Sequence, residues 1–402
     1  MIGGDPGRVP TGISLDSWQS APHIHWAFQH IADFLPTAVI SRGRGPVVEL
    51  PSVPTRLTDL PLNAGVAPAP SGHGAAPTTV GQVMATTATD GWIVTQHGKI
   101  LAEEYYSGMV PNTSHLLMSV SKSLIGMVVG ALHGESMLDV DHPVTAYVPA
   151  LGKSGYAGAT VRNALDMRSG IAFSEDYLDP GAEVRLLEQA IGWAPRTVPN
   201  LPTTMYDYLV TLQQKSVHGG PFEYRSCETD VLGWVCEAAS GMRMPELMSQ
   251  LLWSRIGAQR DAAIGVDSVG TGMFDGGINA CLRDLVRFGS IYLNEGYSLT
   301  GAAVTPPAWI ADTYAGGIDS RDAFAASPGD NRMPGGMYRN QVWFPYPSDN
   351  VLLCLGIHGQ MIYVNKAARV VAAKLSSWPL PQNANFLFAT IAAFDAISTY
   401  VS

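Results

Sequence analysis

The order of patterns along the 402-residue chain predicts an α+β fold, an α/β sandwich in which an antiparallel sheet is flanked by helices beside a mostly helical region. β-rich segments come first, near residues 90–106, and helical patterns with loops follow from about 160 to 260. Apolar β-rich segments return at about 340–376, and a helical pattern closes the chain. A sheet interrupted by a helical region accounts for this order.

The chain is predicted to begin with an extension, residues 1–80, ahead of a main domain at residues 81–402. The extension contains one helical pattern, HIHWAFQHIADFL, which ends at Pro36. Residues 51–80 are rich in Pro, Ala, Gly and Thr, a composition that favours an extended wrap over the surface instead of a regular element.

Three segments of the main domain predict its elements. Residues 90–106, DGWIVTQHGKILAEEYY, contain two β-rich runs around a turn at His97 and Gly98, which indicates a hairpin. Residues 121–133, SKSLIGMVVGALH, are apolar on all sides with small residues interspersed, as in a helix buried between larger elements. The segment NFLFATIAAFDAIS predicts the closing helix.

Composition excludes several classes of function. The formal charge of -10 arises from 34 acidic and 24 basic residues without a basic run, so no nucleic-acid partner is expected. No stretch approaches the roughly 20 uninterrupted apolar residues that span a bilayer, so no membrane is expected either. The first 30 residues lack the basic and apolar regions of a secretory signal, which favours a cytoplasmic location. Four cysteines without a CxxC pair are expected to be reduced and mostly buried: Cys227, Cys236, Cys281 and Cys354.

The start of the buried helix carries a candidate nucleophile. Ser119 and Lys122 are three residues apart, so at a helix start they lie on one face, where the amine can reach the hydroxyl. The helix N-terminus also offers a free backbone N–H for an oxyanion. A lysine acts as a base only if its pKa is lowered, and the apolar run that follows predicts the burial that would lower it. The alternative is that Ser119 caps the helix and the Lys122 amine extends to solvent.

A second candidate element, Tyr224-x-Ser226, lies about a hundred residues further on. An adjacent ammonium would favour the phenolate form of Tyr224, so a lysine and tyrosine pair could carry the proton from Ser119 to the leaving group. The alternative is a core tyrosine bonded to the backbone.

The third element is the GIHGQ segment at residues 356–360, between two β-rich runs. Its glycines permit close approach of the backbone, and the Gln360 N–H is a candidate second oxyanion donor opposite the Ser119 N–H. His358 and Gly359 are candidate substrate contacts, although His358 is equally compatible with a buried core histidine.

Other chemistries have no support in the sequence. The chain contains no GxSxG nucleophile elbow and no HExxH motif, and the His23-x-His25 pair has no third ligand candidate nearby. Neither a metal nor a cofactor is therefore expected.

These three elements, in this order and spacing, resemble those of the serine β-lactamase and penicillin-binding-protein superfamily, which implies a β-lactamase/transpeptidase-like fold. SLDSWQ, HLLMSVSKSL, VVGAL, EDYLDP, GIHGQ and KLSSWP more closely resemble the 6-aminohexanoate-dimer hydrolases (nylon-oligomer hydrolases) and their carboxylesterase relatives, from about residue 14 to the C-terminus. The resemblance implies Ser119 as nucleophile and Lys122 and Tyr224 as the pair that carries the proton. It also implies an oxyanion hole made by the backbone N–H groups of Ser119 and Gln360. It also allows for a homodimer.

Residues of the substrate pocket can be carried over as well. Trp343 matches a tryptophan that covers the family's pocket, and Ser226 belongs to the second element. Phe173 is aligned with a tyrosine that hydrogen-bonds the scissile amide, and Asp275 replaces an asparagine before a Gly-Gly pair. Because an alkoxide is a better leaving group than an amide nitrogen, the missing hydroxyl favours ester over amide cleavage.

The expected substrate is thus a small ester, with linear amides such as the 6-aminohexanoate dimer cleaved more slowly. Asp275 is a candidate for binding a cationic amine of the substrate, and Asp176 and Asp179 are further candidates, although solvated loop acids explain these two better. A β-lactamase or D-amino-acid peptidase is the alternative enzyme, but Ile357-His358-Gly359 stands where a Lys-Thr-Gly element is expected. A non-catalytic penicillin-recognition module is the alternative from another class.

Overall fold

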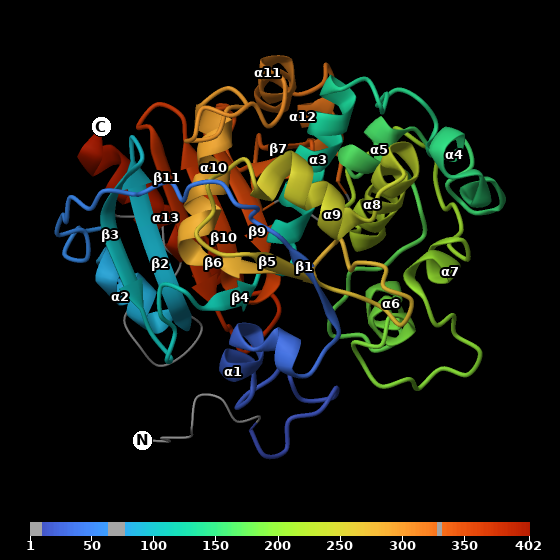
Figure 1. The fold of residues 1–402 in the computed structure, drawn as a ribbon, viewed down its shortest axis with the longest axis horizontal. Coiled ribbons are helices and arrows are strands. Elements are labelled where there is room, and N and C mark those ends of the chain that lie inside the picture. Colours follow the sequence, from blue (N-terminus) through green and yellow to red (C-terminus); the bar gives the residue numbers. More distant parts are fainter. Residues whose placement is uncertain (1–9, 63–76, 328–331) are drawn as a thin grey trace.

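Two antiparallel sheets organise residues 10–62, 77–327 and 332–402, the parts of the chain that the computed structural model describes (Figure 1). The larger sheet has seven strands in the order β3-β2-β11-β10-β9-β8-β7. Its strands are β2 (Thr89–Gln96), β3 (Lys99–Tyr105), β7 (Met337–Arg339), β8 (Val342–Phe344), β9 (Val351–Gly356), β10 (Gln360–Asn365) and β11 (Val370–Ser376).

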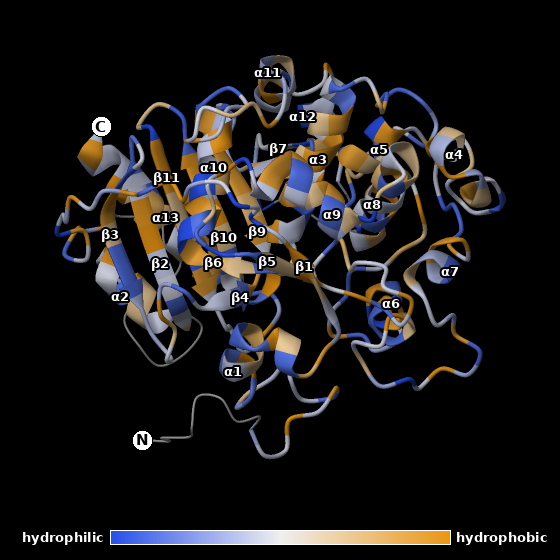
Figure 2. Cartoon of the chain, in the orientation of Figure 1, coloured by the Kyte–Doolittle hydropathy of each residue, from blue (hydrophilic) through white to orange (hydrophobic). Residues whose placement is uncertain are grey.

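The larger sheet is covered on both faces, and its sequence reflects this burial. Alternate residues of β2 enter different cores, Ile93 on one face and Trp92 and Val94 on the other. Figure 2 shows the resulting run of apolar strands at β9, β10 and β11. Because neither face meets solvent, these strands are continuously apolar and do not alternate with polar residues.

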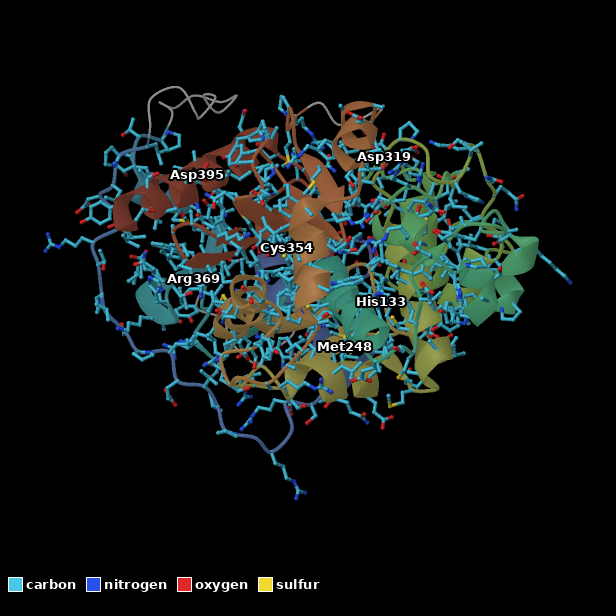
Figure 3. The ribbon with its side chains drawn as sticks, turned by 90° about the horizontal axis from the view of Figure 1, so that it is seen from above. His133, Met248, Asp319, Cys354, Arg369 and Asp395 are labelled. Carbon is cyan, nitrogen blue, oxygen red and sulfur yellow. The ribbon has the colours of Figure 1, made fainter. Side chains whose placement is uncertain are left out.

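Helices form the outer layers. On one face of the larger sheet α3 (Val120–Gly134) and α10 (Leu282–Leu293) pack against the strands, and on the other lie α2 (Val80–Thr86) and α13 (Ala384–Val401). Figure 3 shows the molecule turned by 90°, with Cys354 of β9 near the centre and Asp395 of α13 toward one edge. Within the described residues, α13 alone is long and apolar enough to cross a membrane, and half of it is buried in the protein.

The helical region lies beside the larger sheet, as the sequence predicts. Its regular helices are α4 (Val144–Tyr147), α5 (Val161–Leu165), α6 (Glu183–Ala190), α7 (Met205–Leu209), α8 (Ser226–Ser240) and α9 (Met244–Met248). Short 3-10 and π segments add Pro149–Lys153 and Ser249–Trp253, and two helices, α11 (Pro307–Ala315) and α12 (Ser320–Ala325), precede β7.

The smaller sheet was not predicted. Its order is β1-β5-β6-β4, with β1 (Thr37–Ile40), β4 (Ser114–Leu116), β5 (Ala262–Gly265) and β6 (Ile278–Cys281). β1 pairs with β5 at a separation of more than two hundred residues, so the N-terminal extension shares a sheet with the main domain. Strands of three or four residues carry too little periodicity to be recognised from sequence.

The predicted individual elements are mostly confirmed. The hairpin at 90–106 is β2 and β3, the buried helix is α3, and the closing helix is α13. The N-terminal helix is shorter than predicted, α1 (Ile24–Gln29), because His30 leaves helical geometry at φ -137° before a 3-10 turn at Ile31–Asp33. Of the predicted wrap, residues 63–76 lie outside the described residues.

Candidate active site

Ser119 stands at the junction between β4 and α3. The preceding Met118 has a left-handed backbone, φ +45°, which turns the chain sharply from the strand into the helix. Ser119 is the N-cap residue of α3, is 8% exposed, and lines a cavity of about 700 Å³. Its side chain makes no capping hydrogen bond, so capping the helix does not occupy this hydroxyl.

The Lys122 amine meets Ser119 one turn into the helix. Lys122 Nζ is 3.0 Å from Ser119 Oγ, 3.0 Å from Ser226 Oγ and 2.8 Å from the backbone oxygen of Asp275. The Asp275 Oδ2 atom lies slightly further away, at 3.4 Å. An ammonium has three hydrogens to donate, and these acceptors use all of them. Lys122 is 1% exposed, so its amine does not extend to solvent.

The charge of Lys122 differs from the prediction. Burial by itself lowers the pKa of Lys122, but surrounding groups raise it above its usual range. These groups, in order of effect, are Tyr224, Asp275, Glu175 and Asp230. Lys122 is buried as predicted, but the expectation that its pKa is lowered overall is wrong, because the sequence did not show that Tyr224 and acids from three distant segments meet at this lysine.

Tyr224 is the third member of the site. Burial raises the pKa of its hydroxyl, whereas the Lys122 ammonium and a hydrogen bond with Ser119 lower it. Lys122 Nζ lies 5.4 Å from the centre of the Tyr224 ring. Since Ser119 Oγ accepts from the ammonium, its own hydrogen is available for the Tyr224 oxygen.

Two buried acids lie behind the lysine. The backbone N–H of Asp275 donates to Asp230 Oδ1 at 3.1 Å, and burial together with the Asp275 charge raises the pKa of Asp230. Among the described residues, Asp230 Oδ2 and Asp275 Oδ1 are buried without a hydrogen-bond partner. Such a cluster of acids is stable beside an ammonium and is costly beside a neutral amine.

Both residues that carry the predicted oxyanion donors line the cavity. Gln360 begins β10 and pairs with Gly356 at the end of β9, and both residues line the cavity with Ser119. A Cβ atom on Gly356 would lie 3.0 Å from the Ser119 nitrogen and 2.6 Å from the Leu117 oxygen. A glycine is needed here because the β9–β10 turn presses against the backbone that leads to Ser119.

The structure brings most of the predicted site residues together. Those that line the cavity are Ser119, Phe173, Tyr224, Trp343, Gly359 and Gln360. Those that lie behind its wall are Lys122, Ser226, Asp275 and His358. The two loop acids, Asp176 and Asp179, are exposed and do not line it.

Two predicted substrate contacts therefore need correction. The contacts of Asp275 hold the Lys122 amine, and its carboxylate does not line the cavity where a substrate amine would lie. His358 is 1% exposed, its Nδ1 lies 2.7 Å from the Trp378 oxygen, and burial lowers its pKa to about 4. It is a neutral histidine of the core.

A tyrosine hydroxyl near Phe173 was missed by the sequence reasoning. Tyr177 lines the same cavity and donates its hydroxyl to Glu175, which also lines it and accepts from the Ser226 backbone. The carboxyl of Glu175 has a raised pKa because of its burial. Although Phe173 has no hydroxyl, the cavity that it lines is therefore also lined by a tyrosine. The tyrosine and the glutamate lie in the EDYLDP segment, where the sequence points to Asp176 and Asp179 instead.

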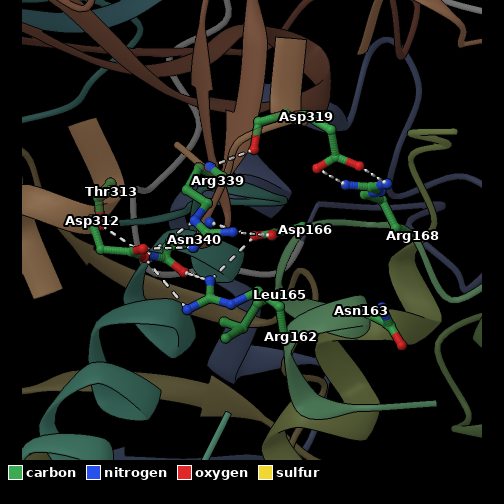
Figure 4. Close-up of polar contacts among 12 residues, drawn as sticks. Arg162, Asn163, Leu165, Asp166, Arg168, Asp312, Thr313, Asp319, Arg339 and Asn340 are labelled. Atoms are coloured by element: carbon green, nitrogen blue, oxygen red, sulfur yellow. Dashed lines mark hydrogen bonds and ion pairs between the residues drawn. The ribbon is translucent and has the colours of Figure 1, made fainter. Parts of the chain in front are cut away.

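Trp343 reaches the cavity from a hairpin that a polar network holds (Figure 4). Arg339, at the end of β7, is 2.6 Å from Asp166 Oδ2 and also pairs with Asp312 of α11. Asn340 donates to Asp312 at 2.9 Å. The hairpin places the Trp343 ring 5.3 Å from the Tyr224 ring at an angle of 30°, so the tryptophan shields the tyrosine.

Comparisons with known proteins show which family the chain is similar to. The chain matches the family described as Beta-lactamase over residues 76–395. It is 39% identical to the 6-aminohexanoate-dimer hydrolase of Paenarthrobacter ureafaciens over 381 residues, which are 94% of this chain and 91% of that protein.

Solved structures show the same fold. A Bacillus anthracis protein assigned as a 6-aminohexanoate-dimer hydrolase superposes with a TM-score of 0.86 at 23% identity, covering 98% of this chain and 99% of that one. A family VIII carboxylesterase superposes with a TM-score of 0.59 at 14% identity, covering 79% of this chain and 96% of that one.

Proposed function

Because this chain belongs to the Beta-lactamase family, as a hydrolase related to the 6-aminohexanoate-dimer hydrolases, we propose that it cleaves small esters and linear amides through an acyl-enzyme at Ser119. The observation that carries the proposal is the 3.0 Å contact between Lys122 Nζ and Ser119 Oγ at the wall of a cavity of about 700 Å³. A cavity of this size suits a small organic substrate.

The reactive form is the one in which Lys122 is an ammonium and Tyr224 has lost its proton; because burial raises the pKa of Tyr224 overall, this form is the minor one at neutral pH and is populated as the pH rises. Ser119 Oγ attacks the substrate carbonyl carbon while its proton passes to the Tyr224 oxygen. The carbonyl oxygen becomes an oxyanion, which accepts hydrogen bonds from the backbone N–H groups of Ser119 and Gln360. Lys122 stabilises both the developing charge and the phenolate, and its proton stays in place.

Collapse of the tetrahedral intermediate breaks the bond to the leaving group. The departing oxygen or nitrogen takes the proton from Tyr224, and the acyl group remains as an ester of Ser119. Water then attacks this ester and gives a proton to Tyr224, which returns it to Ser119 Oγ as the acid leaves. Both half-reactions use the same groups and require no other proton carrier.

The choice between ester and amide depends on the wall that holds Phe173 and Tyr177. An amide nitrogen must be protonated as it leaves, so amide cleavage depends more on a positioned hydroxyl than ester cleavage does. Tyr177 also lines the cavity; its hydroxyl hydrogen is donated to Glu175, which leaves its oxygen to accept a hydrogen bond from a substrate amide N–H, and this supports amide cleavage in addition to ester cleavage. The 6-aminohexanoate dimer is the linear amide to test, since the relative at 39% identity is named for it.

Turnover of p-nitrophenyl acetate and butyrate tests the core of the proposal. The wild-type protein is expected to hydrolyse both, and Ser119→Ala is expected to lose this activity. Ser121→Ala is the matched control, because Ser121 lies on the same helix and its hydroxyl accepts from the Ile278 backbone at 3.1 Å. Equal slow rates for wild type and Ser119→Ala would refute the proposal.

Two measurements refine it. A fluorophosphonate followed by peptide mass mapping is expected to label Ser119, and labelling elsewhere would contradict the assignment. Phe173→Tyr is expected to raise dimer cleavage relative to ester cleavage, and Tyr177→Phe to lower it. If neither variant changes the ratio, this wall does not set substrate class.

A further inference from the structure

We propose that the N-terminal segment, residues 10–40, is a positioning element for the oxyanion hole, with the Phe28 ring holding in register the two segments that carry the Ser119 and Gln360 N–H groups. This inference rests on the proposed function, because it assigns a role in the same reaction. Phe28 lies on α1, which precedes the matched family region and does not line the cavity.

The two donor N–H groups come from segments that are far apart in the sequence, so no short covalent connection fixes the distance between them. Ser119 follows β4 of the smaller sheet, and Gln360 begins β10 of the larger sheet. The two segments press together where Gly356 meets the Ser119 nitrogen and the Leu117 oxygen. A displacement of about 1 Å between such groups can cost about a hundredfold in rate, so their support decides how well they act.

Phe28 contacts one histidine from each segment. Its ring centre lies 5.7 Å from that of His115, in β4, at an interplanar angle of 87°. It lies 5.4 Å from that of His358, two residues before Gln360, at 90°. Phe28, His115 and His358 are each at most 1% exposed. One phenyl ring is thus packed edge-on between the two segments, a favoured geometry for aromatic pairs.

His358 depends on this contact. Its backbone is left-handed, with φ +58°, a conformation that needs surrounding support in a residue other than glycine. Its Nδ1 donates to the Trp378 oxygen, and among the described residues its Nε2 has no hydrogen-bond partner. The remaining side of the ring is therefore held by packing, which Phe28 supplies.

A second tie connects the same segments through Asp90 of β2. One carboxylate oxygen is 2.7 Å from His25 Nδ1 on α1, and the other is 3.2 Å from His115 Nε2 and accepts from the Ser377 hydroxyl. The neighbouring Ser376 pairs with the Gln360 side chain, at 2.7 Å through its oxygen and 3.0 Å through its nitrogen. The extension is thereby fastened beside both donors.

Kinetics of Phe28→Ala and Phe28→Leu in the full-length protein test the proposal, with p-nitrophenyl butyrate as substrate. Phe28→Ala is expected to lower kcat by about 10- to 100-fold with KM changed less than about threefold, because the donors act mainly on the transition state. Phe28→Leu restores part of the packing and is expected to recover most of kcat. Phe288→Ala is the matched control, since Phe288 is fully buried on α10 beside Tyr292.

Inhibition by 1-butaneboronic acid gives a second readout. Its tetrahedral adduct on Ser119 places an oxygen in the oxyanion hole, so its Ki is expected to rise in Phe28→Ala about as much as kcat falls. Phe288→Ala is expected to lower the melting temperature and leave kcat and Ki within about threefold. If Phe28→Ala does not fold, Phe28→Leu and Phe28→Met carry the test with smaller losses in the same two quantities.

The outcomes separate the two proposals. An active wild type with unchanged kcat and Ki in the Phe28 variants overturns the positioning role and leaves the proposed function standing. Equal losses in Phe28→Ala and Phe288→Ala also overturn it, because the effect is then one of general stability. A wild type no faster than Ser119→Ala overturns both.

Discussion

Two lysines of this protein are completely buried, and their surroundings give them opposite charge behaviour. Lys122, at the start of α3, lies among acids and a tyrosine that raise its pKa. Lys374, on β11, contacts the Thr87 oxygen at 3.3 Å and the Ser376 hydroxyl, and its Nζ is 5.5 Å from the centre of the Trp378 ring. Burial lowers the pKa of Lys374 to about 7, with only Asp90 opposing it.

The difference shows that burial alone does not decide whether a lysine acts as a base or as a cation. Both amines lose hydration to a similar degree, and what separates them is that Tyr224 and three carboxylates act on Lys122, whereas a single carboxylate acts on Lys374. At Lys122 the acids come from α8 and from loops that meet only in the fold. The lysine of the proposed active site is therefore a fixed cation, whereas the lysine that can lose its proton near neutral pH lies in the core.

Replacing each lysine by methionine gives the largest expected contrast. Lys122→Met is expected to lower kcat/KM for p-nitrophenyl butyrate by about a thousandfold or more, because the phenolate of Tyr224 loses its counter-charge. Lys374→Met is expected to change kcat/KM by less than about tenfold. Steady-state kinetics of both purified variants measure this contrast, and a comparable loss in the two would remove it.

Removing one acid beside Lys122 tests the origin of its charge. The Asp275 carboxylate raises the pKa of both Lys122 and Tyr224. In Asp275→Asn the Tyr224 hydroxyl should therefore lose its proton more easily, and the ascending limb of kcat/KM against pH is expected to move to lower pH. The pH–rate profile from pH 6 to 10 measures this shift. An unchanged limb, or a shift to higher pH, would contradict the role given to Asp275.

How far the sequence predicts this site can be seen from the same residues. Ser119, Lys122 and Tyr224 are recognisable because a helix start fixes the first two and a short motif marks the third. The sheet region is also predictable, because strands buried on both faces leave long apolar runs. The charge of Lys122 is not predictable in this way, because it depends on Tyr224 and on three acids that long-range contacts bring to the lysine.

Other parts of the site escape the sequence for a similar reason. Phe28 lies in an extension without any chemical motif, and its role follows only from contacts with His115 and His358. Tyr177 lines the cavity together with Phe173, four residues earlier, but only Phe173 is predicted, because short motifs do not show which neighbouring side chains also reach the cavity.

The stability of the protein as a function of pH should reveal Lys374. Its pKa in the folded state, about 7, is below the value of about 10.4 in an unfolded chain. Between these values the unfolded state binds a proton that the folded state does not, so the folded state gains stability as pH rises from 7 to 10. Below pH 7 the buried Lys374 is charged, and the free energy of unfolding is then lower than at pH 10 by an amount on the order of 5 kcal/mol.

Lys374→Met removes this dependence, since methionine fills a similar volume without a charge. The variant is expected to melt at a higher temperature than wild type at pH 7, with the gap narrowing by about 3 °C or more by pH 9. Thermal unfolding followed by circular dichroism at both pH values measures it. A gap that stays constant with pH would show that Lys374 keeps its proton and that the two lysines do not differ.

The smallest expected effect concerns Asp90, the carboxylate that raises the pKa of Lys374. Its charge is already engaged by His25 and His115, which lower its pKa, and Asp90 in turn raises the pKa of His25. A raised histidine pKa contributes stability that is complete below about pH 6.5 and is lost as pH rises through the folded value. His25→Gln should therefore lower the melting temperature by about 1 °C at pH 6 and by less at pH 8.5, as expected for a pair that is partly exposed to solvent.

Because Asp90 is less neutralised in this variant, the pKa of Lys374 should rise slightly, and the stability gained between pH 7 and 9 should shrink. A loss of melting temperature in His25→Gln that grows with pH would mean that His25 binds Asp90 as a neutral ring. The negative charge of Asp90 would then be free to act on Lys374.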